Sequence, residues 1–124
     1  MSFTLKLDIE AIKRHAENDV PFECCGLIIE DGSIIRCENT AQDRTKNFLI
    51  PAHEMRRIAK QHTIVGVYHS HVDSGAYLSA SDREGAWMFG RLYIVASIIK
   101  GVCKDVKSYH LQGSAGKKLF VELQ

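Results

Sequence analysis

The run TIVGVYHSH, residues 63–71, constrains the fold of this chain more than any other stretch. It is rich in β-branched residues, which are typical of strands packed inside a domain. Residues i and i+2 of a strand point to the same side, so His69 and His71 face one way and Ser70 faces the other. We therefore predict a buried strand that ends with two imidazoles on one face.

A helix and a hairpin are predicted before this strand. Apolar residues recur at helical spacing within residues 7–19, and Pro21 favours an end of that helix near Asn18. The short apolar run CGLIIE is followed by the turn pair DG and then by SIIRCEN. That succession is typical of a β-hairpin.

The other patterns extend the alternation of strands and helices. NFLIP predicts a brief strand stopped by Pro51, and PAHEMRRIAKQH a helix with this proline in its first turn. SASDREGAWMFGR predicts a helix, and glycine-bearing turns separate three more strands: LYIVASII, CKDVKSYHL and KKLFVEL. This order predicts an α/β fold, a single layered domain over residues 1–124 whose mixed sheet is flanked by helices.

Composition narrows the classes of function. Sixteen Lys and Arg residues against fifteen Asp and Glu argue against a nucleic-acid partner. No apolar run approaches the ~20 residues of a membrane span, and the N-terminus lacks the apolar stretch of a signal peptide, so we expect a cytoplasmic protein without a membrane partner. The cysteines are then expected to be free thiols, with the adjacent Cys24 and Cys25 acting as small buried apolar residues.

The paired histidines have two readings. Two neutral imidazoles on one strand face can hold a zinc ion, or each ring can simply hydrogen-bond nearby. The four other histidines have no ligand spacing and are expected to be surface or capping residues: His15, His53, His62 and His110.

Two acidic residues are equally ambiguous when taken alone. Asp82 lies at the start of the helix after the strand, where it could complete a His, His, Asp ligand set. Alternatively, a capping box could form at this point, either from Ser79 with Asp82 or from Ser81 with Glu84. Glu23, just before CGLIIE, could be a solvated flanking residue or a general base.

Taken together, these residues resemble the JAMM motif of MPN-plus zinc metallopeptidases. The motif is a glutamate, then His-Ser/Thr-His, seven residues, a serine, two residues and an aspartate. Here it is Glu23, then HSH, VDSGAYL, Ser79, AS and Asp82. The resemblance extends to PFECCGLI, IVGVYHSH and LYIVAS and fades after about residue 100.

The resemblance implies a role for each matching residue. His69, His71 and Asp82 would bind one Zn²⁺ per chain, with a water in the fourth position. Glu23 would take a proton from that water and pass it to the leaving amine, and Ser79 would stabilise the oxyanion. The reaction would be hydrolysis of a peptide or isopeptide bond. The resemblance also leaves room for a helix cap. Ser81 would cap the helix, and Ser79 and Asp82 would serve the metal, so that the two roles concern different atoms.

The resemblance also implies a substrate class. Short bacterial relatives resemble enzymes that trim the Gly-Gly tail of ubiquitin-like sulfur carrier proteins, a tail that could add a strand to a sheet edge beside the zinc. Tyr77 and Trp87 are candidate substrate contacts, or ordinary loop and core aromatics. The loop VDSGAYL has Val72 and Leu78 where many relatives have proline, and this difference bears on substrate preference.

Three alternatives stay open within the same family resemblance. MPN domains also serve as non-catalytic scaffolds, although those usually lack the metal ligands. A phage-tail peptidase acting on cell-wall peptides is a second possibility, but such proteins usually carry a further lytic domain. A DNA-repair branch also exists, against which the near-neutral charge argues weakly.

Overall fold

The structure is a computed structural model that describes residues 6–84, 90–114 and 117–123. Six strands form one sheet: β1 Cys25–Ile29, β2 Ile34–Cys37, β3 Ile64–Val72, β4 Leu92–Ile99, β5 Val102–Ser114 and β6 Lys117–Leu123. The helices are α1 Ile9–Asp19, α2 Ala52–Ala59 and α3 Ala80–Glu84. In the described parts of the chain, no helix has the length and apolar character needed to span a membrane.

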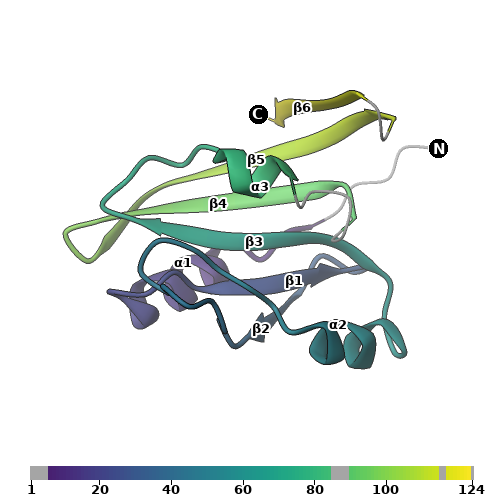
Figure 1. Ribbon diagram of the computed structural model, residues 1–124, viewed down its shortest axis with the longest axis horizontal. Coiled ribbons are helices and arrows are strands. Elements are labelled where there is room, and N and C mark those ends of the chain that lie inside the picture. The colour runs from purple at the N-terminus through teal and green to yellow at the C-terminus, as the bar shows by residue number, and fades with distance from the viewer. Residues whose placement is uncertain (1–5, 85–89, 115–116, 124) are drawn as a thin grey trace.

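The strand order β2-β1-β3-β4-β5-β6 confirms the predicted mixed sheet (Figure 1). β3 and β4 run parallel, and every other neighbouring pair is antiparallel. The predicted hairpin is the β1–β2 pair, which closes with Ile28 opposite Ile34. β3, which carries the paired histidines, lies inside the sheet with a partner on each side.

The two faces of the sheet hold two separate apolar clusters, as the alternation of side chains in strands requires. One face carries Leu27, Val67 and Val95, and the segment before α2 and the α2 residue Ile58 cover it. The other face carries Tyr68, Ile94 and their neighbours and packs against Ile12 and Ala16 of α1. Figure 1 shows α1 behind the sheet and α3 in front of it. His69 shares the first face, because it follows Val67 by two residues.

The strand predicted at NFLIP is wrong, because these residues are irregular in the structure. Their apolar side chains Phe48 and Ile50 pack on the sheet, but their backbone does not join it. The side chain of Asn39 replaces a neighbouring strand: its Oδ1 accepts from Leu49 N at 3.1 Å, and its Nδ2 donates to Asn47 O at 2.9 Å. Pro51 precedes α2, which begins at Ala52.

His15 is also not the surface or capping residue that its spacing suggested. It lies on α1, is 4% exposed and packs edge-on against Tyr68 of β3. Its Nδ1 lies 2.8 Å from the Tyr68 hydroxyl, and its Nε2 lies 3.3 Å from Asp19 Oδ2. Burial lowers the pKa of His15, and although Asp19 opposes this effect, the pKa stays below its ordinary value.

This lowered pKa predicts a pH-dependent loss of stability. The unfolded chain binds a proton at His15 near pH ~6.5, whereas the folded chain binds it only at lower pH. The contribution of His15 to the free energy of unfolding should therefore fall as pH drops below about 6.5 and stop falling below the folded pKa. In urea titrations between about pH 7.5 and pH 5, the free energy of unfolding of the wild type relative to that of His15→Gln should fall as pH drops. Parallel curves for the two proteins would contradict this assignment.

Candidate metal centre

Three predicted ligand residues converge beside β3. His69 and His71 are both buried on the strand, and their Nε2 atoms lie 3.2 Å apart. Asp82, near the start of α3, brings its Oδ2 to 3.0 Å from the Nε2 of His69 and 3.5 Å from that of His71. One ligand atom from each of the three residues lies within 4.8 Å of the other two, so the group could hold a metal ion.

The spacing of these atoms is that of three corners of a tetrahedron around a small cation. Zinc binds imidazole nitrogen and carboxylate oxygen at roughly 2.0–2.1 Å, which sets the corners of a tetrahedral site roughly 3.3–3.4 Å apart. The three separations in the structure, 3.0, 3.2 and 3.5 Å, scatter around that value. Two imidazoles and one carboxylate are also the ligand chemistry of catalytic zinc sites with an open fourth position.

A backbone carbonyl orients the ring of His71. Its Nδ1 lies 2.9 Å from Gly75 O, and a carbonyl can only accept, so Nδ1 carries the proton. A neutral His71 then presents an unprotonated Nε2 toward His69 and Asp82. Outer hydrogen bonds of this kind hold metal-binding histidines in a fixed tautomer.

The start of α3 corrects the prediction that capping and ligation concern different atoms. Ser79 Oγ accepts from Asp82 N at 3.2 Å, and Asp82 Oδ2 accepts from Ser79 N at 2.9 Å, which together form a capping box. That same Oδ2 contacts His69, so one oxygen serves the helix and the ligand group. Ser81 does not precede the helix but lies within it, with its Oγ 3.2 Å from Ser79 Oγ.

Pairing between β1 and β3 places Glu23 beside the histidines. Cys25 pairs with His69, and the register continues because Ser70 N donates to Cys24 O at 3.1 Å. Two residues further along, Glu23 comes opposite His71. The hydroxyl of the fully buried Ser70 reinforces this pairing, since its Oγ accepts from Cys24 N at 2.8 Å.

Two residues that hold the backbone around Glu23 could not be predicted from the sequence. One is Ser70, whose side chain points away from the imidazoles and was expected only to face the other side of the strand. The other is Asn39, whose Nδ2 donates to Glu23 O at 2.9 Å. The two contacts join segments 46 and 16 residues apart, so no local pattern could have revealed them.

The electrostatics of the group follow from its burial and its hydrogen bonds. Burial raises the pKa of Glu23 to about 7, against the opposing effect of His71. Burial would also raise the pKa of Asp82, but the contacts with the rings of His69 and His71 outweigh it and hold that pKa well below its usual value. The pKa of His71 is raised: burial lowers it, but the contacts with Asp82 and the Gly75 carbonyl more than compensate.

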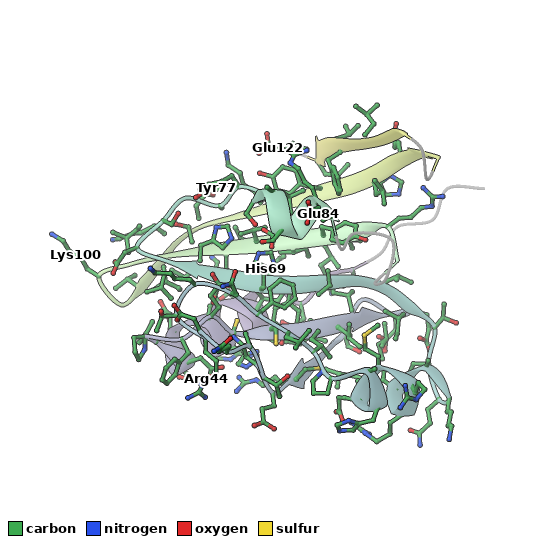
Figure 2. The ribbon with its side chains drawn as sticks, in the orientation of Figure 1. Arg44, His69, Tyr77, Glu84, Lys100 and Glu122 are labelled. Carbon is green, nitrogen blue, oxygen red and sulfur yellow. The ribbon has the colours of Figure 1, made fainter. Side chains whose placement is uncertain are left out.

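A pocket of about 440 Å³ opens over this group, and Figure 2 labels two of the residues that line it, His69 and Tyr77. Glu23, Ser79 and the three converging residues all line it. Phe48 stacks on His69 with ring centroids 4.5 Å apart, and Tyr77 packs edge-on against His71 at 5.1 Å. Tyr77 is half exposed at the mouth of the pocket. Trp87, the other predicted substrate contact, lies outside the described residues.

Both neighbours of β3 restrict where a strand could be added beside the ligand group. β4 pairs with β3 from Gly66 to Val72, whereas the pairing with β1 ends at His69, followed by the hydrogen bond from Ser70 N to Cys24 O. The two outermost strands of the sheet are β2 and β6, which do not carry these residues.

The expected character of Cys24 and Cys25 is confirmed. Both thiols are fully buried and free, and they point to opposite faces of the sheet. Burial raises the pKa of Cys24 to about 12 and raises that of Cys25 as well, so neither thiol ionises near neutral pH.

The fold and the ligand group define a JAB/MPN domain with a possible metal site. Residues 8–111 match the family described as prokaryotic homologs of the JAB domain, and the chain belongs to that family. This family match extends past residue 100 and ends within β5, before β6 begins. The JAB/MPN families include metallopeptidases.

Solved structures from three organisms share the fold. A protein from Salinibacter ruber is 25% identical, covers 98% of this chain and 89% of its own, and has a TM-score of 0.65. One from Desulfitobacterium hafniense is 20% identical at 94% and 87% coverage, with a TM-score of 0.66. A JAB1/MPN domain protein from Archaeoglobus fulgidus is 18% identical, with 82% coverage of each chain and a TM-score of 0.52.

Tail tip assembly protein K of Escherichia phage N15 is 30% identical over 78 residues. The match covers 60% of this chain but only 32% of the phage protein, so the shared segment is about a third of that relative.

The hydroxyl of Ser70 yields a stability prediction. Ser70→Ala leaves the buried Cys24 N–H without its acceptor, so the free energy of unfolding should fall by about 1–3 kcal/mol. Denaturant titration measures this change. Ser33→Ala is the matched control, because its hydroxyl contacts Asp31 in an exposed turn and its loss should cost less than about 0.5 kcal/mol. Equal midpoints for Ser70→Ala and the wild type would refute the assignment.

Proposed function

We propose that this chain is a zinc-dependent hydrolase of peptide or isopeptide bonds, with His69, His71 and Asp82 as the ligands. One observation carries the proposal. Three ligand atoms at tetrahedral spacing share a pocket with the buried carboxyl group of Glu23. Zn²⁺ held by these residues supplies a Lewis acid for the substrate carbonyl and for the attacking water.

Glu23 is the proposed general base and acid. Its buried carboxyl group lines the same pocket as the ligand group, so its carboxylate can accept a proton from the attacking water and return it to the departing amine. The water oxygen forms the new C–O bond, the C–N bond breaks, and the proton leaves with the nitrogen. Asn39 and Ser70 hold the backbone around Glu23, so the carboxyl group has a fixed starting position.

Ser79 is the proposed oxyanion donor. Its Oγ already accepts from Asp82 N, so the hydroxyl proton is directed either to Ser81 or into the pocket that Ser79 lines. A donor aimed at the developing oxyanion contributes about 2.7–4 kcal/mol in comparable sites. Ser79 therefore combines two roles, capping α3 through a lone pair and donating through its proton.

The proposed substrate is the C-terminal Gly-Gly tail of a ubiquitin-like or sulfur carrier protein. Phe48 and Tyr77 flank the ligand group, one on His69 and the other on His71. Glycine residues, having no side chain, let an extended backbone pass closely between such rings. The pocket supports this class, because the attacked carbonyl has to approach atoms that are buried on β3.

The phage relative favours a second candidate. Similarity to tail tip assembly protein K supports a peptidase that acts on peptides during phage assembly or entry, such as cell-wall peptides. The same ligands and the same base serve either substrate, so the two candidates differ only in what the pocket walls accept.

Metal analysis tests the centre itself. Protein purified without chelators should contain about one zinc per chain. His71→Ala should lose that zinc because it removes one of three ligands. Glu23→Gln should retain the zinc but hydrolyse substrate about 10²–10⁴ times more slowly. Wild-type protein without zinc would refute the proposal, and full activity of Glu23→Gln would refute the role of the base.

Mass spectrometry of candidate substrates tests the substrate class. Sulfur carrier proteins extended beyond Gly-Gly should lose the extension when mixed with zinc-loaded protein, and should stay intact with zinc-loaded Glu23→Gln. Cross-linked cell-wall peptides form the parallel arm of the experiment. Cleavage in that arm alone would replace the first candidate with the second, and cleavage in neither arm would favour a non-catalytic scaffold.

A further inference from the structure

Three consecutive carbonyls after β3 each accept a hydrogen bond from a side chain of the sheet. The residues are Ser74, Gly75 and Ala76, within a segment called here the 73–78 loop. Their donors are, in order, Ser97 Oγ of β4, His71 Nδ1 of β3 at 2.9 Å and Tyr109 Oη of β5 at 2.8 Å. The loop thus runs across three neighbouring strands and is bonded to each of them.

These contacts replace the regular hydrogen bonds that the loop lacks. Residues 73–78 belong to no helix or strand, and none of them is a proline that would pre-set the backbone. Asp73 N donates to Ile98 O at 2.6 Å where the loop begins. From Ser74 to Ala76, each carbonyl accepts from one of the three side chains beneath the loop, and Gly75 O accepts a second hydrogen bond from Tyr77 N.

The middle carbonyl bears directly on the ligand group. Gly75 O accepts the Nδ1 proton of His71, so the neutral ring, which is the form that binds a metal, has an unprotonated Nε2 directed at His69 and Asp82. Gly75 has no side chain that could hold this carbonyl in place. Gly75 O also accepts from Tyr77 N at 3.0 Å, and the hydrogen bonds from Ser97 and Tyr109 hold the carbonyls on either side of it, so all three contacts restrict its direction.

We propose that Ser97 and Tyr109 are positioning residues of the metal centre, acting through the Gly75 carbonyl on the ring of His71. The inference rests on the proposed function, since it concerns how the chain prepares a ligand for zinc. It assigns a role to two strands, β4 and β5, that contribute none of the three ligands.

The test measures zinc affinity in variants that lose only a hydroxyl group. Tyr109→Phe and Ser97→Ala each remove one donor, and the double variant removes both. The probe is Zn²⁺, with the dissociation constant determined by competition with a chelator. We expect the double variant to bind about tenfold more weakly, the lower end of what is lost when a group that orients a ligand is removed. The visible spectrum of the Co²⁺-loaded double variant should also shift.

Tyr68→Phe is the matched control. It removes a buried tyrosine hydroxyl that contacts His15 on the opposite face of the sheet, away from the 73–78 loop. We expect it to lose stability in denaturant titrations, as Tyr109→Phe does, yet to keep the wild-type zinc affinity and Co²⁺ spectrum. A general loss of stability would weaken zinc binding in both variants, whereas a positioning role affects only Tyr109→Phe.

The outcomes distinguish failure of this inference from failure of the proposed function on which it rests. If the wild type binds zinc and the double variant stays within twofold of it, the positioning role is wrong and the proposed function stands. The same holds if Tyr68→Phe weakens binding as much as Tyr109→Phe. A wild type that binds no zinc overturns both. If the double variant does not fold, Tyr109→Phe alone against Tyr68→Phe decides.

Discussion

The structure depends on the antiparallel pairing of β1 with β3. This pairing brings Cys24 and Ser70, 46 residues apart in the sequence, into mutual contact through backbone and side chain. It buries the middle of the sheet, and in the same step it places a carboxyl group across from two imidazoles. The parallel partner β4 then pairs with the other side of β3 from Gly66 to Val72, so the strand that bears the histidines lies inside the sheet.

Three segments of the chain contribute different residues to the candidate centre. β3 supplies two ligands on one face, because its period of two residues leaves Ser70 free to bond β1. α3 supplies the third ligand within its first turn, where the capping box restricts the carboxylate. The segment before α2 supplies an aromatic wall, Phe48, together with Asn39, whose amide bonds to the Glu23 carbonyl.

Much of the fold could be predicted from the sequence, because its strands and α1 follow local periodicity. The wrong predictions share one physical cause. In each case the local sequence fitted two structures equally well, and a contact between residues far apart in the chain determined which one formed. Ser79 and Ser81 both fit a capping box, and only the packing of Asp82 against β3 selects the first. His15 was expected at the surface because it has no ligand spacing. It is buried against Tyr68, which lies 53 residues away in the sequence. NFLIP has the apolar residues of a strand, yet the Asn39 side chain takes the place of a pairing strand.

The oxygen that Asp82 shares between helix and ligand group has a consequence for how a cation would be captured. Asp82 Oδ2 is already fixed by the amide of Ser79, and the proton of His71 Nδ1 is already assigned to a carbonyl. An arriving ion therefore meets donors whose conformational freedom was lost when the chain folded. Binding to such a preorganised cluster costs little conformational entropy, because the side chains are already ordered. The cluster would therefore bind the ion with little rearrangement of the protein.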